Sequence, residues 1–243
     1  MFLSVIIPAY NEEKRLPQTL NKVRDYLLKQ DYEYEVIVVD DGSKDKTAQT
    51  SKKIIESWKN FKIISYEPNR GKGYAVKTGM LAAKGEYAIL MDADNSTDLS
   101  EVEKFWPYTK SKQNGQNYEI VIGSRYLNKS SIKIKQPLSR RVVSRLGNFL
   151  IRAVLGIQSV DTQCGFKMFS LGAVQKIFPK QQIERWGFDM EILAIAIREG
   201  YKIKEVAVDW YDAEGSQVKK GAAMKTLKEL WQIKKNIWAG KYN

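Results

Sequence analysis

The chain has 243 residues, of which 43% are apolar and 28% charged, a size and balance that fit one large α/β domain and exclude a disordered, collagen-like or polytopic membrane protein. Histidine is absent and Cys164 is the one cysteine, which excludes a Ser-His-Asp triad, an imidazole base, a histidine-rich zinc site and an internal disulfide, and favours a reducing compartment. The net charge of +12 gathers in residues 129–160 and 215–243, and the rest of the chain is close to neutral.

Strand and helix patterns alternate through the first half of the chain. Apolar runs predict strands over residues 1–8, 34–39, 61–66, 86–91 and 118–122. The first run lacks the basic leader and the cleavage site of a signal peptide. Helical periodicity fills the intervals, beginning with an apolar face at Leu16, Leu20, Val23 and Leu27. This alternation is typical of βα units, and it predicts an α/β fold with a mostly parallel sheet covered by helices on both faces.

The second half predicts two basic amphipathic helices, with an alternating strand over 203–210 between them. The helix over 138–157 has an apolar stripe of Leu138, Val142, Leu146, Phe149, Leu150, Ala153 and Ile157. The helix over 222–238 has a similar stripe of Met224, Leu227, Trp231 and Trp238. No apolar run reaches the roughly 18–20 residues that a spanning helix needs, so we expect no membrane crossing.

Polar loops follow four of the predicted strands. They are Pro-Ala-Tyr-Asn-Glu at 8–12, Asp-Asp-Gly-Ser at 40–43, Asn-Arg-Gly-Lys-Gly at 69–73 and Asp-Ala-Asp at 92–94. Ligands of open parallel sheets bind beyond the carboxyl ends of the strands, so these loops are expected to form one site. The loop at 69–73 leads into a helix N-terminus suited to anions, although such a loop alone is equally an ordinary surface loop.

The acidic pair Asp92 and Asp94 predicts a metal site. Mg²⁺ and Mn²⁺ take carboxylates together with substrate phosphate oxygens, and two carboxylates at the end of an apolar strand favour such a cation. The alternative is a solvated turn or a helix cap. The position of the pair in a series of polar strand ends favours the metal.

Asp40 and Asp41 follow the second strand and invite two interpretations. An aspartate at a strand end can accept a hydrogen bond from a base imide N–H or from a ribose hydroxyl. The alternative is a turn followed by a helix cap, as Asp and Asn often provide. Capping fits Asp41 better, and ligand binding fits Asp40 better.

These motifs in this order, with Gly-Ser-Arg-Tyr at 123–126, resemble the inverting glycosyltransferases of family 2, which have the GT-A fold. The motifs at 161–167, 184–191 and 208–216 more specifically resemble the dolichyl-phosphate β-glucosyltransferases, relatives of dolichyl-phosphate mannosyltransferase. The resemblance spans about residues 3–235. It implies one GT-A domain over 1–243, with a nucleotide-sugar half at 1–126 and an acceptor and membrane-facing half at 127–243.

Carried over by position, the resemblance implies a role for each motif. The nucleotide-sugar pocket would comprise Pro8, Tyr10, Glu12, Asp40, Lys72, Asp92, Ala93, Asp94 and Arg125. Asp94 would be the principal metal ligand, assisted by Asp92. Arg125 would contact phosphate between donor and acceptor, while Asp161, Asp189 and Glu191 would lie on the acceptor side. The residues implied in catalysis are Asp94, Arg125 and Asp189.

Three positions depart from the related patterns. Ser96 stands where mannosyl relatives often have glutamine, Gln217 where a phosphate-binding lysine is expected, and Tyr211 where the mannosyl relatives have arginine. Lys219 and Lys220 are candidates to reach the same phosphate. The glucosyl relatives usually carry an N-terminal membrane helix, and we expect none in this sequence.

The resulting hypothesis is a metal-dependent transfer of glucose from UDP-glucose to a polyprenyl or dolichyl phosphate, with inversion from α to β; a GDP-sugar is a less favoured donor. Mg²⁺ or Mn²⁺ and Arg125 would neutralise charge on the leaving nucleoside diphosphate. A lipid phosphate is largely dianionic at neutral pH and needs no side-chain base. The basic helices would dock on an anionic membrane, alone or with a membrane-anchoring subunit, which gives a cytoplasmic, peripherally associated protein.

Several alternatives stay open at this point. An enzyme of the same fold could act on a polysaccharide, a teichoic-type polymer or a protein hydroxyl, and would then need a base among Asp161, Asp189 and Glu191. A nucleotidyltransferase also uses paired carboxylates and metal. A nucleic-acid-binding module would explain the net charge but would leave the acidic pair without a purpose, so no nucleic acid is expected as a partner. The apolar stripes could instead be core.

Overall fold

The structure is a computed structural model, which describes residues 1–109, 117–127, 138–211 and 222–243. Of residues 138–146 and 222–224 only the backbone is described. The predicted stripe residues Leu138, Val142, Leu146 and Met224, and the phosphate-binding candidates Gln217, Lys219 and Lys220, therefore lie outside the described side chains.

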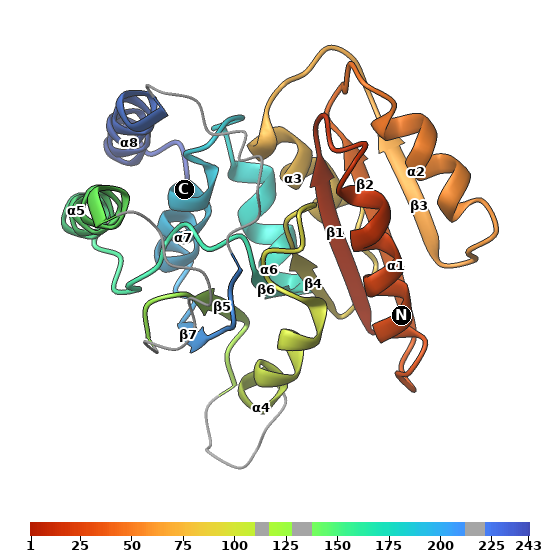
Figure 1. Ribbon diagram of the computed structural model, residues 1–243. Coiled ribbons are helices and arrows are strands. Elements are labelled where there is room, and N and C mark those ends of the chain that lie inside the picture. The colour runs from red at the N-terminus through yellow and green to blue at the C-terminus, as the bar shows by residue number, and fades with distance from the viewer. Residues whose placement is uncertain (110–116, 128–137, 212–221) are drawn as a thin grey trace.

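Strands of the described ranges form one seven-stranded sheet in the order β3-β2-β1-β4-β6-β5-β7 (Figure 1). Their bounds are β1 Leu3–Ala9, β2 Tyr34–Asp40, β3 Phe61–Ser65, β4 Tyr87–Leu90, β5 Ile120–Ser124, β6 Lys167–Ser170 and β7 Ile203–Ala207. β6 pairs antiparallel with β4 and β5, whereas the other neighbouring strands pair in parallel. The prediction of an α/β fold with a mostly parallel sheet is confirmed.

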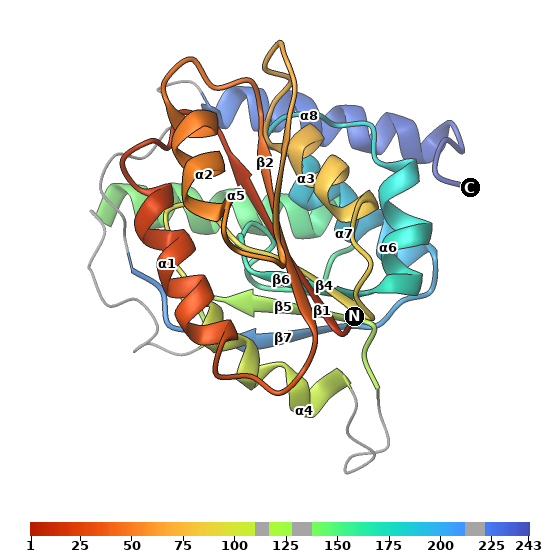
Figure 2. The same cartoon turned by 90° about the vertical axis from the view of Figure 1, so that its right-hand side faces the viewer.

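Helices connect the strands and flank the sheet (Figure 2). The α-helices are α1 Leu16–Leu27, α2 Thr47–Ile55, α3 Lys72–Leu81, α4 Trp106–Thr109, α5 Leu138–Leu155, α6 Leu171–Ile177, α7 Phe188–Arg198 and α8 Ala222–Trp238. Two short 3-10 helices, η1 Leu99–Lys104 and η3 Phe178–Lys180, complete the described elements.

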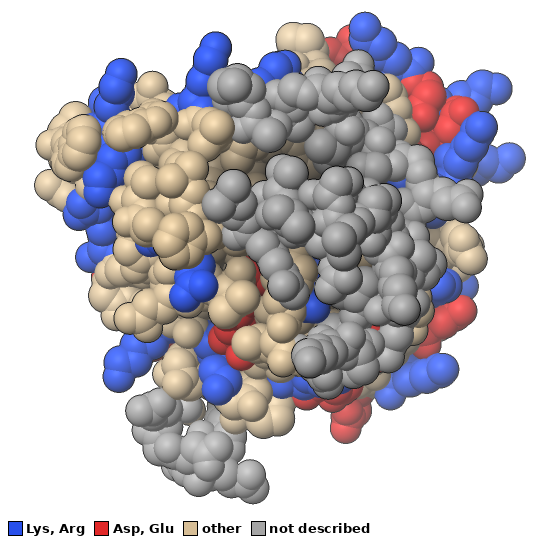
Figure 3. All heavy atoms as spheres, turned by 60° about the vertical axis from the view of Figure 1, so that its left-hand side comes forward, with Lys and Arg blue, Asp and Glu red and all other residues tan. Residues whose placement is uncertain are grey.

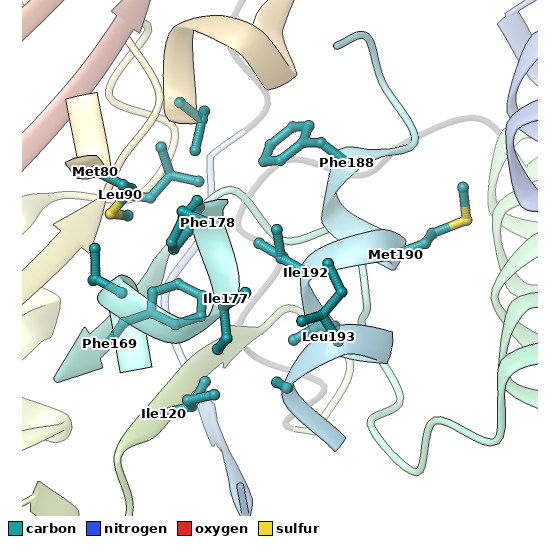
Figure 4. Close-up of a cluster of buried hydrophobic side chains, with 14 of the residues drawn as sticks. Met80, Leu90, Ile120, Phe169, Ile177, Phe178, Phe188, Met190, Ile192 and Leu193 are labelled. Carbon is teal, nitrogen blue, oxygen red and sulfur yellow. The ribbon is translucent and has the colours of Figure 1, made fainter. Parts of the chain in front are cut away.

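The hydrophobic core has two layers, one on each face of the sheet. On one face, the predicted apolar side of α1, including Leu20 and Val23, packs against β1 and β2. On the other face, α3, α6, α7 and α8 cover the sheet, with large side chains such as Phe169, Phe178 and Phe188 (Figure 4). The expectation of a sheet covered on both faces is confirmed.

The antiparallel strand β6 lies in the middle of the sheet, between β4 and β5. Its first residue, Lys167, pairs with Leu90 at the end of β4 and with Ile122 in β5. A strand that runs against its neighbours brings its beginning, rather than its end, to the edge where the neighbours finish. Lys167 is therefore placed at the edge that carries the polar loops. Neither β6 nor α7 was predicted from the sequence.

Helices α5 and α8 lie side by side, and parts of their predicted apolar stripes face outward (Figure 1). Phe149 of α5 is 65% exposed, and Trp231 and Trp238 of α8 are 55% and 69% exposed. Leu150, Ala153 and Leu227 are exposed as well, whereas Ile157 is buried. The buried contacts of the two helices come from other positions, Ile151, Leu230 and Ile233. None of the described helices is both long enough and apolar enough to span a bilayer.

Candidate active site

The polar loops come together at the carboxyl ends of β1, β2 and β4, as the sequence predicts. The loop after β1 is tied to the loop after β2, since the backbone N–H groups of Asn11 and Glu12 donate to Ser43 Oγ at 2.9 Å and Thr47 Oγ1 at 2.7 Å. The loop before α3 is tied to the end of β4, because Lys72 Nζ lies 2.6 Å from Asp92 Oδ1. One edge of the sheet therefore gathers the candidate residues.

Asp40 ends β2 as a buried carboxylate, and its Oδ1 lacks a hydrogen-bond partner among the described residues. Burial raises the pKa of Asp40, while hydrogen bonds from Ser43 oppose the rise. An unmet buried acceptor is costly unless a ligand satisfies it. The structure thus leaves Asp40 suited to an incoming N–H or O–H donor.

Asp41 has a structural task that differs from the predicted cap. Its carboxylate accepts hydrogen bonds from Tyr66, Asn69 and the backbone N–H groups of Arg70 and Gly71, at 2.7–3.0 Å. These bonds shape the loop at 69–73. At the start of α2 it is Asp45, one residue before the N-cap Lys46, whose Oδ1 accepts from the Thr47 N–H at 2.9 Å.

The loop at 69–73 packs against the segment at 183–185. Gly71 has a φ of +115°, and a Cβ there would lie 2.6 Å from the Glu184 carbonyl oxygen. At Gly73 a Cβ would lie 2.5 Å from the Ile183 carbonyl oxygen. The same Glu184 oxygen accepts from the Tyr74 N–H at 3.0 Å. The glycines thus allow a close backbone approach, which fixes the start of α3.

Glu12 is paired with a residue that the sequence analysis missed, Arg15. Arg15 Nε donates to Glu12 Oε2 at 2.7 Å, and Arg15 Nη1 lies 4.0 Å from Asp94 Oδ2. Burial raises the pKa of Glu12, and Arg15 opposes this rise. Arg15 therefore joins the loop after β1 to the acidic pair, and its i,i+3 spacing from Glu12 is the signal that the sequence offered.

Asp92 lies against a glycine and is held by a cation. Its carboxylate forms an ion pair with Lys72, and a Cβ on Gly165 would lie 2.1 Å from Asp92 Oδ2. Burial favours the neutral form, but the charges of Lys72, Lys167 and Arg125 prevail and lower the pKa of Asp92 below its usual value. A residue larger than glycine at position 165 would therefore require the Asp92 carboxylate to move.

The acidic pair fits a metal that takes most of its ligands from elsewhere. Across the described ranges, no three acidic or thiol side chains group together as a complete metal site. Asp94 is partly exposed and its Oδ1 accepts the Ser96 N–H at 3.0 Å. Mg²⁺ is commonly held by one or two carboxylates together with phosphate oxygens and water, which suits this donor set. Lys72 engages Asp92, so Asp94 is the better placed carboxylate.

Arg125, which follows β5, is held by Asp161. Its Nε and Nη2 each donate to a different Asp161 oxygen at 2.7 Å, and its backbone N–H donates to the same carboxylate at 3.0 Å. The guanidinium also lies near the rings of Tyr126 and Trp210. Asp161 is fully buried, and although burial opposes ionisation, Arg125 lowers the pKa of Asp161. Asp161 therefore orients Arg125 and is occupied by it.

The acidic residues of α7 point to different surroundings. Asp189 lies 2.5 Å from the Nζ of Lys167, which is fully buried, and this ion pair interacts electrostatically with Lys72 and Asp92. Glu191 accepts hydrogen bonds from the Gln182 and Ile183 N–H groups and from the Tyr242 hydroxyl, the last at 2.6 Å. Of the three residues assigned to the acceptor side, Glu191 is engaged by the C-terminal segment.

The remaining predicted residues flank these groups. Pro8 is buried near the end of β1, Tyr10 follows this strand and is half-buried, and Ala93 lies buried between the two aspartates. The departing positions Ser96 and Tyr211 are neighbours, since the Tyr211 N–H donates to the Ser96 carbonyl oxygen at 2.8 Å.

Comparison with known proteins agrees with this arrangement. The family model described as glycosyl transferase family 2 matches residues 4–178. A dolichyl-phosphate beta-glucosyltransferase of Trichomonas vaginalis is 36% identical over 98% of this chain and 76% of its own length, and the human dolichyl-phosphate beta-glucosyltransferase is 40% identical over 89% and 69%. The chain belongs to glycosyl transferase family 2 and is a member of the dolichyl-phosphate β-glucosyltransferase group.

Solved structures place this glycosyltransferase in the GT-A fold. Glucosyl-3-phosphoglycerate synthase from Mycobacterium tuberculosis, in complex with Mn²⁺, UDP-glucose and phosphoglyceric acid, is similar with a TM-score of 0.68 at 16% identity, over 96% of this chain and 80% of that one. Mannosyl-3-phosphoglycerate synthase from Rubrobacter xylanophilus has a TM-score of 0.71 at 13% identity, over 99% and 75%. At these identities the likeness shows the fold alone.

Proposed function

We propose that this glycosyltransferase transfers glucose from UDP-glucose to a polyprenyl phosphate, such as dolichyl phosphate, at a membrane surface. The observation that carries the proposal is the identity of 36–40% with enzymes named dolichyl-phosphate beta-glucosyltransferases, which covers 89–98% of the chain. The gathering of Asp40, Asp94 and Arg125 at one edge of the sheet supports it.

The donor lies, in this proposal, between the loops of the first half. Asp40 accepts from the base or the ribose, which satisfies its unpartnered oxygen. Pro8, Tyr10 and Ala93 line the pocket, and Glu12 with Arg15 closes one side. Residues 1–126 thus act as the nucleotide-sugar half and residues 127–243 as the acceptor half of one domain.

The diphosphate of the donor lies beside the acidic pair. Asp94, assisted by Asp92, would hold Mg²⁺ or Mn²⁺, which when bound neutralises charge on the leaving UDP. Lys72 remains paired with Asp92 at 2.6 Å, and its positive charge reduces the repulsion between the two carboxylates and the diphosphate. Arg15 contributes further positive charge from the other side of Asp94.

The acceptor phosphate approaches Arg125, whose orientation is fixed by Asp161. A phosphate dianion is itself the nucleophile, so no side chain needs to remove a proton. In-line attack on the anomeric carbon then inverts its configuration. Asp161 is engaged by Arg125, Glu191 by Tyr242 and Asp189 by Lys167. Of these three residues we assign the contact with the reactants to Asp189, the one that the family resemblance implies in catalysis.

We also infer that the outward face of α5 and α8 rests on an anionic membrane. Phe149, Trp231 and Trp238 are exposed there, and Lys228 and Lys235 are exposed on the same helix as the tryptophans. In Figure 3, which turns this side of the molecule forward, uncharged and cationic side chains predominate on the left and few acidic ones are visible. Aromatic side chains with lysines around them suit the lipid interface.

The donor is tested by thermal unfolding with a panel of UDP- and GDP-sugars, each with and without Mn²⁺. A ligand that binds the folded chain alone raises Tm by mass action. We expect the largest rise with UDP-glucose and Mn²⁺, and the Asp94→Ala variant to lose the part of the rise that depends on metal. A larger rise with a GDP-sugar would contradict the donor assignment.

The acceptor is tested by incubating the enzyme with labelled UDP-glucose and polyprenyl phosphate. We expect a labelled product that partitions into organic solvent, together with release of UDP. A labelled product that stays in water and appears only with a hydroxyl acceptor would replace this assignment. Release of pyrophosphate would indicate a nucleotidyltransferase instead.

A further inference from the structure

Lys167 is a fully buried lysine that the proposed reaction leaves without a task. It is the first residue of β6, at the edge of the sheet where the candidate site lies. Its Nζ donates to the carbonyl oxygen of Cys164 and to Asp189 Oδ1, the latter at 2.5 Å. The exposed fraction of the Lys167 side chain is 0% and that of Asp189 is 7%.

Stability alone is a weak reason for this ion pair. Removing two charges from water costs several kcal/mol per ion, and apolar residues of similar volume often serve the fold as well or better. The surrounding core offers such residues, since Phe188 and Met190 beside Asp189 are fully buried. The ion pair between β6 and α7, next to the candidate site, therefore suggests a role in the reaction.

The Lys167–Asp189 pair is one of two neighbouring lysine–aspartate ion pairs. Asp92 is held by Lys72 from α3, and Asp189 is held by Lys167 from β6. Burial raises the pKa of Asp189, the positive charges of Lys167 and Lys72 oppose this rise, and the charge of Asp92 adds to it. Asp92 and Asp189 thus each have a lysine as their partner.

We propose that Lys167 is a positioning residue of the transfer reaction, which holds the Asp189 carboxylate in one orientation toward the reactants. Lys167 itself contacts neither donor nor acceptor and acts through Asp189. This inference rests on the proposed function, in which Asp189 is the acidic residue that faces the reactants from α7.

A double-mutant cycle tests the proposal, with Lys167→Met, Asp189→Asn and the double variant of the full chain. We expect Lys167→Met to lower kcat about 100-fold, since a misplaced reacting group costs about this much. Binding of UDP with Mn²⁺, measured by calorimetry, should stay within about threefold. The double variant should be no slower than Asp189→Asn alone, because residues that act as a unit are not additive. Independent, multiplied losses in kcat would overturn the proposal.

Two further variants separate positioning from folding. Lys180→Met removes the lysine of a more exposed ion pair, with Glu199 at 2.5 Å, and should leave kcat within about threefold. The double variant removes both charges of the Lys167–Asp189 pair, so it should fold even if Lys167→Met does not. Its kcat is then compared directly with that of Asp189→Asn, and a further loss of about tenfold or more would contradict the proposal.

The readout distinguishes this proposal from the acceptor assignment. UDP release from UDP-glucose and formation of the organic-soluble product are followed in the same samples. If the parent enzyme releases UDP and makes no lipid product, the acceptor assignment fails, and the cycle is read on UDP release. If the lipid product forms and the losses multiply, the role of Lys167 fails and the acceptor assignment stands.

Discussion

Neighbouring aspartates at the end of β2 illustrate how identical side chains acquire opposite roles. The Asp41 carboxylate accepts four hydrogen bonds, three from residues 69–71 and one from the Tyr66 hydroxyl. Asp40, in contrast, has one buried carboxylate oxygen without a partner among the described groups. The sequence assigns Asp40 to a ligand, which stays a prediction, and Asp41 to a helix cap, which the structure does not show. The specific partners of Asp41 lie 25–30 positions away in the sequence, and local spacing does not reveal them.

The first prediction contrasts these two residues. Asp41→Ala should lower the free energy of unfolding by about 3 kcal/mol, because it leaves several donors without a partner, and Tm should fall by roughly 6–12 °C. Asp40→Asn should change stability by less than about 1 kcal/mol, and it should weaken UDP binding about tenfold or more. Thermal unfolding and calorimetry check both. Equal losses of stability would contradict the assigned roles.

A second prediction concerns pH and the Arg125–Asp161 pair. Arg125 lowers the pKa of Asp161 in the folded state, so the pair stabilises the fold above the ordinary aspartate pKa of 3.8. That stabilisation is lost as the pH falls through 3.8 toward the lower folded value, because the unfolded chain then binds more protons. The free energy of unfolding of Asp161→Asn should fall less steeply below about pH 4, by up to ~1.4 kcal/mol per pH unit.

Chemical denaturation at a series of pH values measures this slope. The control is Asp31→Asn, which removes one negative charge from an exposed position. Its slope should match that of the parent. If Asp161→Asn keeps the slope of the parent as well, the ion pair does not contribute to acid sensitivity.

At the scale of elements, β6 explains why part of the site escaped sequence reasoning. Ligands of parallel sheets bind at the carboxyl ends of the strands, and this rule predicts the loops at 8–12, 40–43, 69–73 and 92–94. An antiparallel strand brings its preceding segment, 161–167, to the same edge. Its four residues are too few for a clear periodic pattern, so neither the strand nor the placement of Lys167 and Gly165 followed from spacing.

A third prediction tests the packing of this segment. Gly165→Ala would bring a methyl group to 2.1 Å from Asp92 Oδ2, so the carboxylate must move. We expect the rise in Tm caused by UDP-glucose with Mn²⁺ to be largely lost, while the Tm of the free protein changes less. The matched control is Gly172→Ala in α6, where a Cβ would meet nothing within 4 Å. A normal response of Gly165→Ala to ligand would show that Asp92 is not needed in its present position.

At the scale of the molecule, the chain separates a polar edge of the sheet from a basic, aromatic face. The sequence located the cations in residues 129–160 and 215–243, and periodicity identified the two helices. Which side of each helix faces the core depends on packing against the rest of the chain. The outward position of Trp231 and Trp238 and the inward position of Leu230 and Ile233 therefore required the structure.

A fourth prediction concerns this face. The enzyme should sediment with phosphatidylglycerol-containing vesicles at low salt and be partly released at high salt, because lysines near an anionic surface contribute electrostatically. The paired substitution Trp231→Ser and Trp238→Ser should weaken vesicle partitioning about tenfold or more, since two exposed indoles would no longer be buried in lipid. Sedimentation over a lipid titration gives the partition coefficient.

The control for this experiment is Leu28→Ser, which removes an apolar side chain that is 60% exposed after α1. Its partitioning should equal that of the parent. If the parent enzyme stays in the supernatant at low salt, the membrane assignment is wrong. If Leu28→Ser weakens partitioning as much as the paired tryptophan substitution does, α8 is not the membrane-binding element.

The inner side of α8 contacts the segment at 182–187, which in turn packs against the loop at 69–73. Glu229 accepts the Gly187 N–H at 2.7 Å, and Asn236 lies 3.4 Å from Gln182, at the two ends of the segment against which Gly71 and Gly73 pack. If a bilayer holds the outer side of α8, a shift of this segment on membrane binding would be felt at Gly71 and Gly73, and a shift on nucleotide binding would be felt at α8. Such coupling is reciprocal. A factor by which vesicles change the nucleotide affinity would then equal the factor by which the nucleotide changes partitioning onto vesicles.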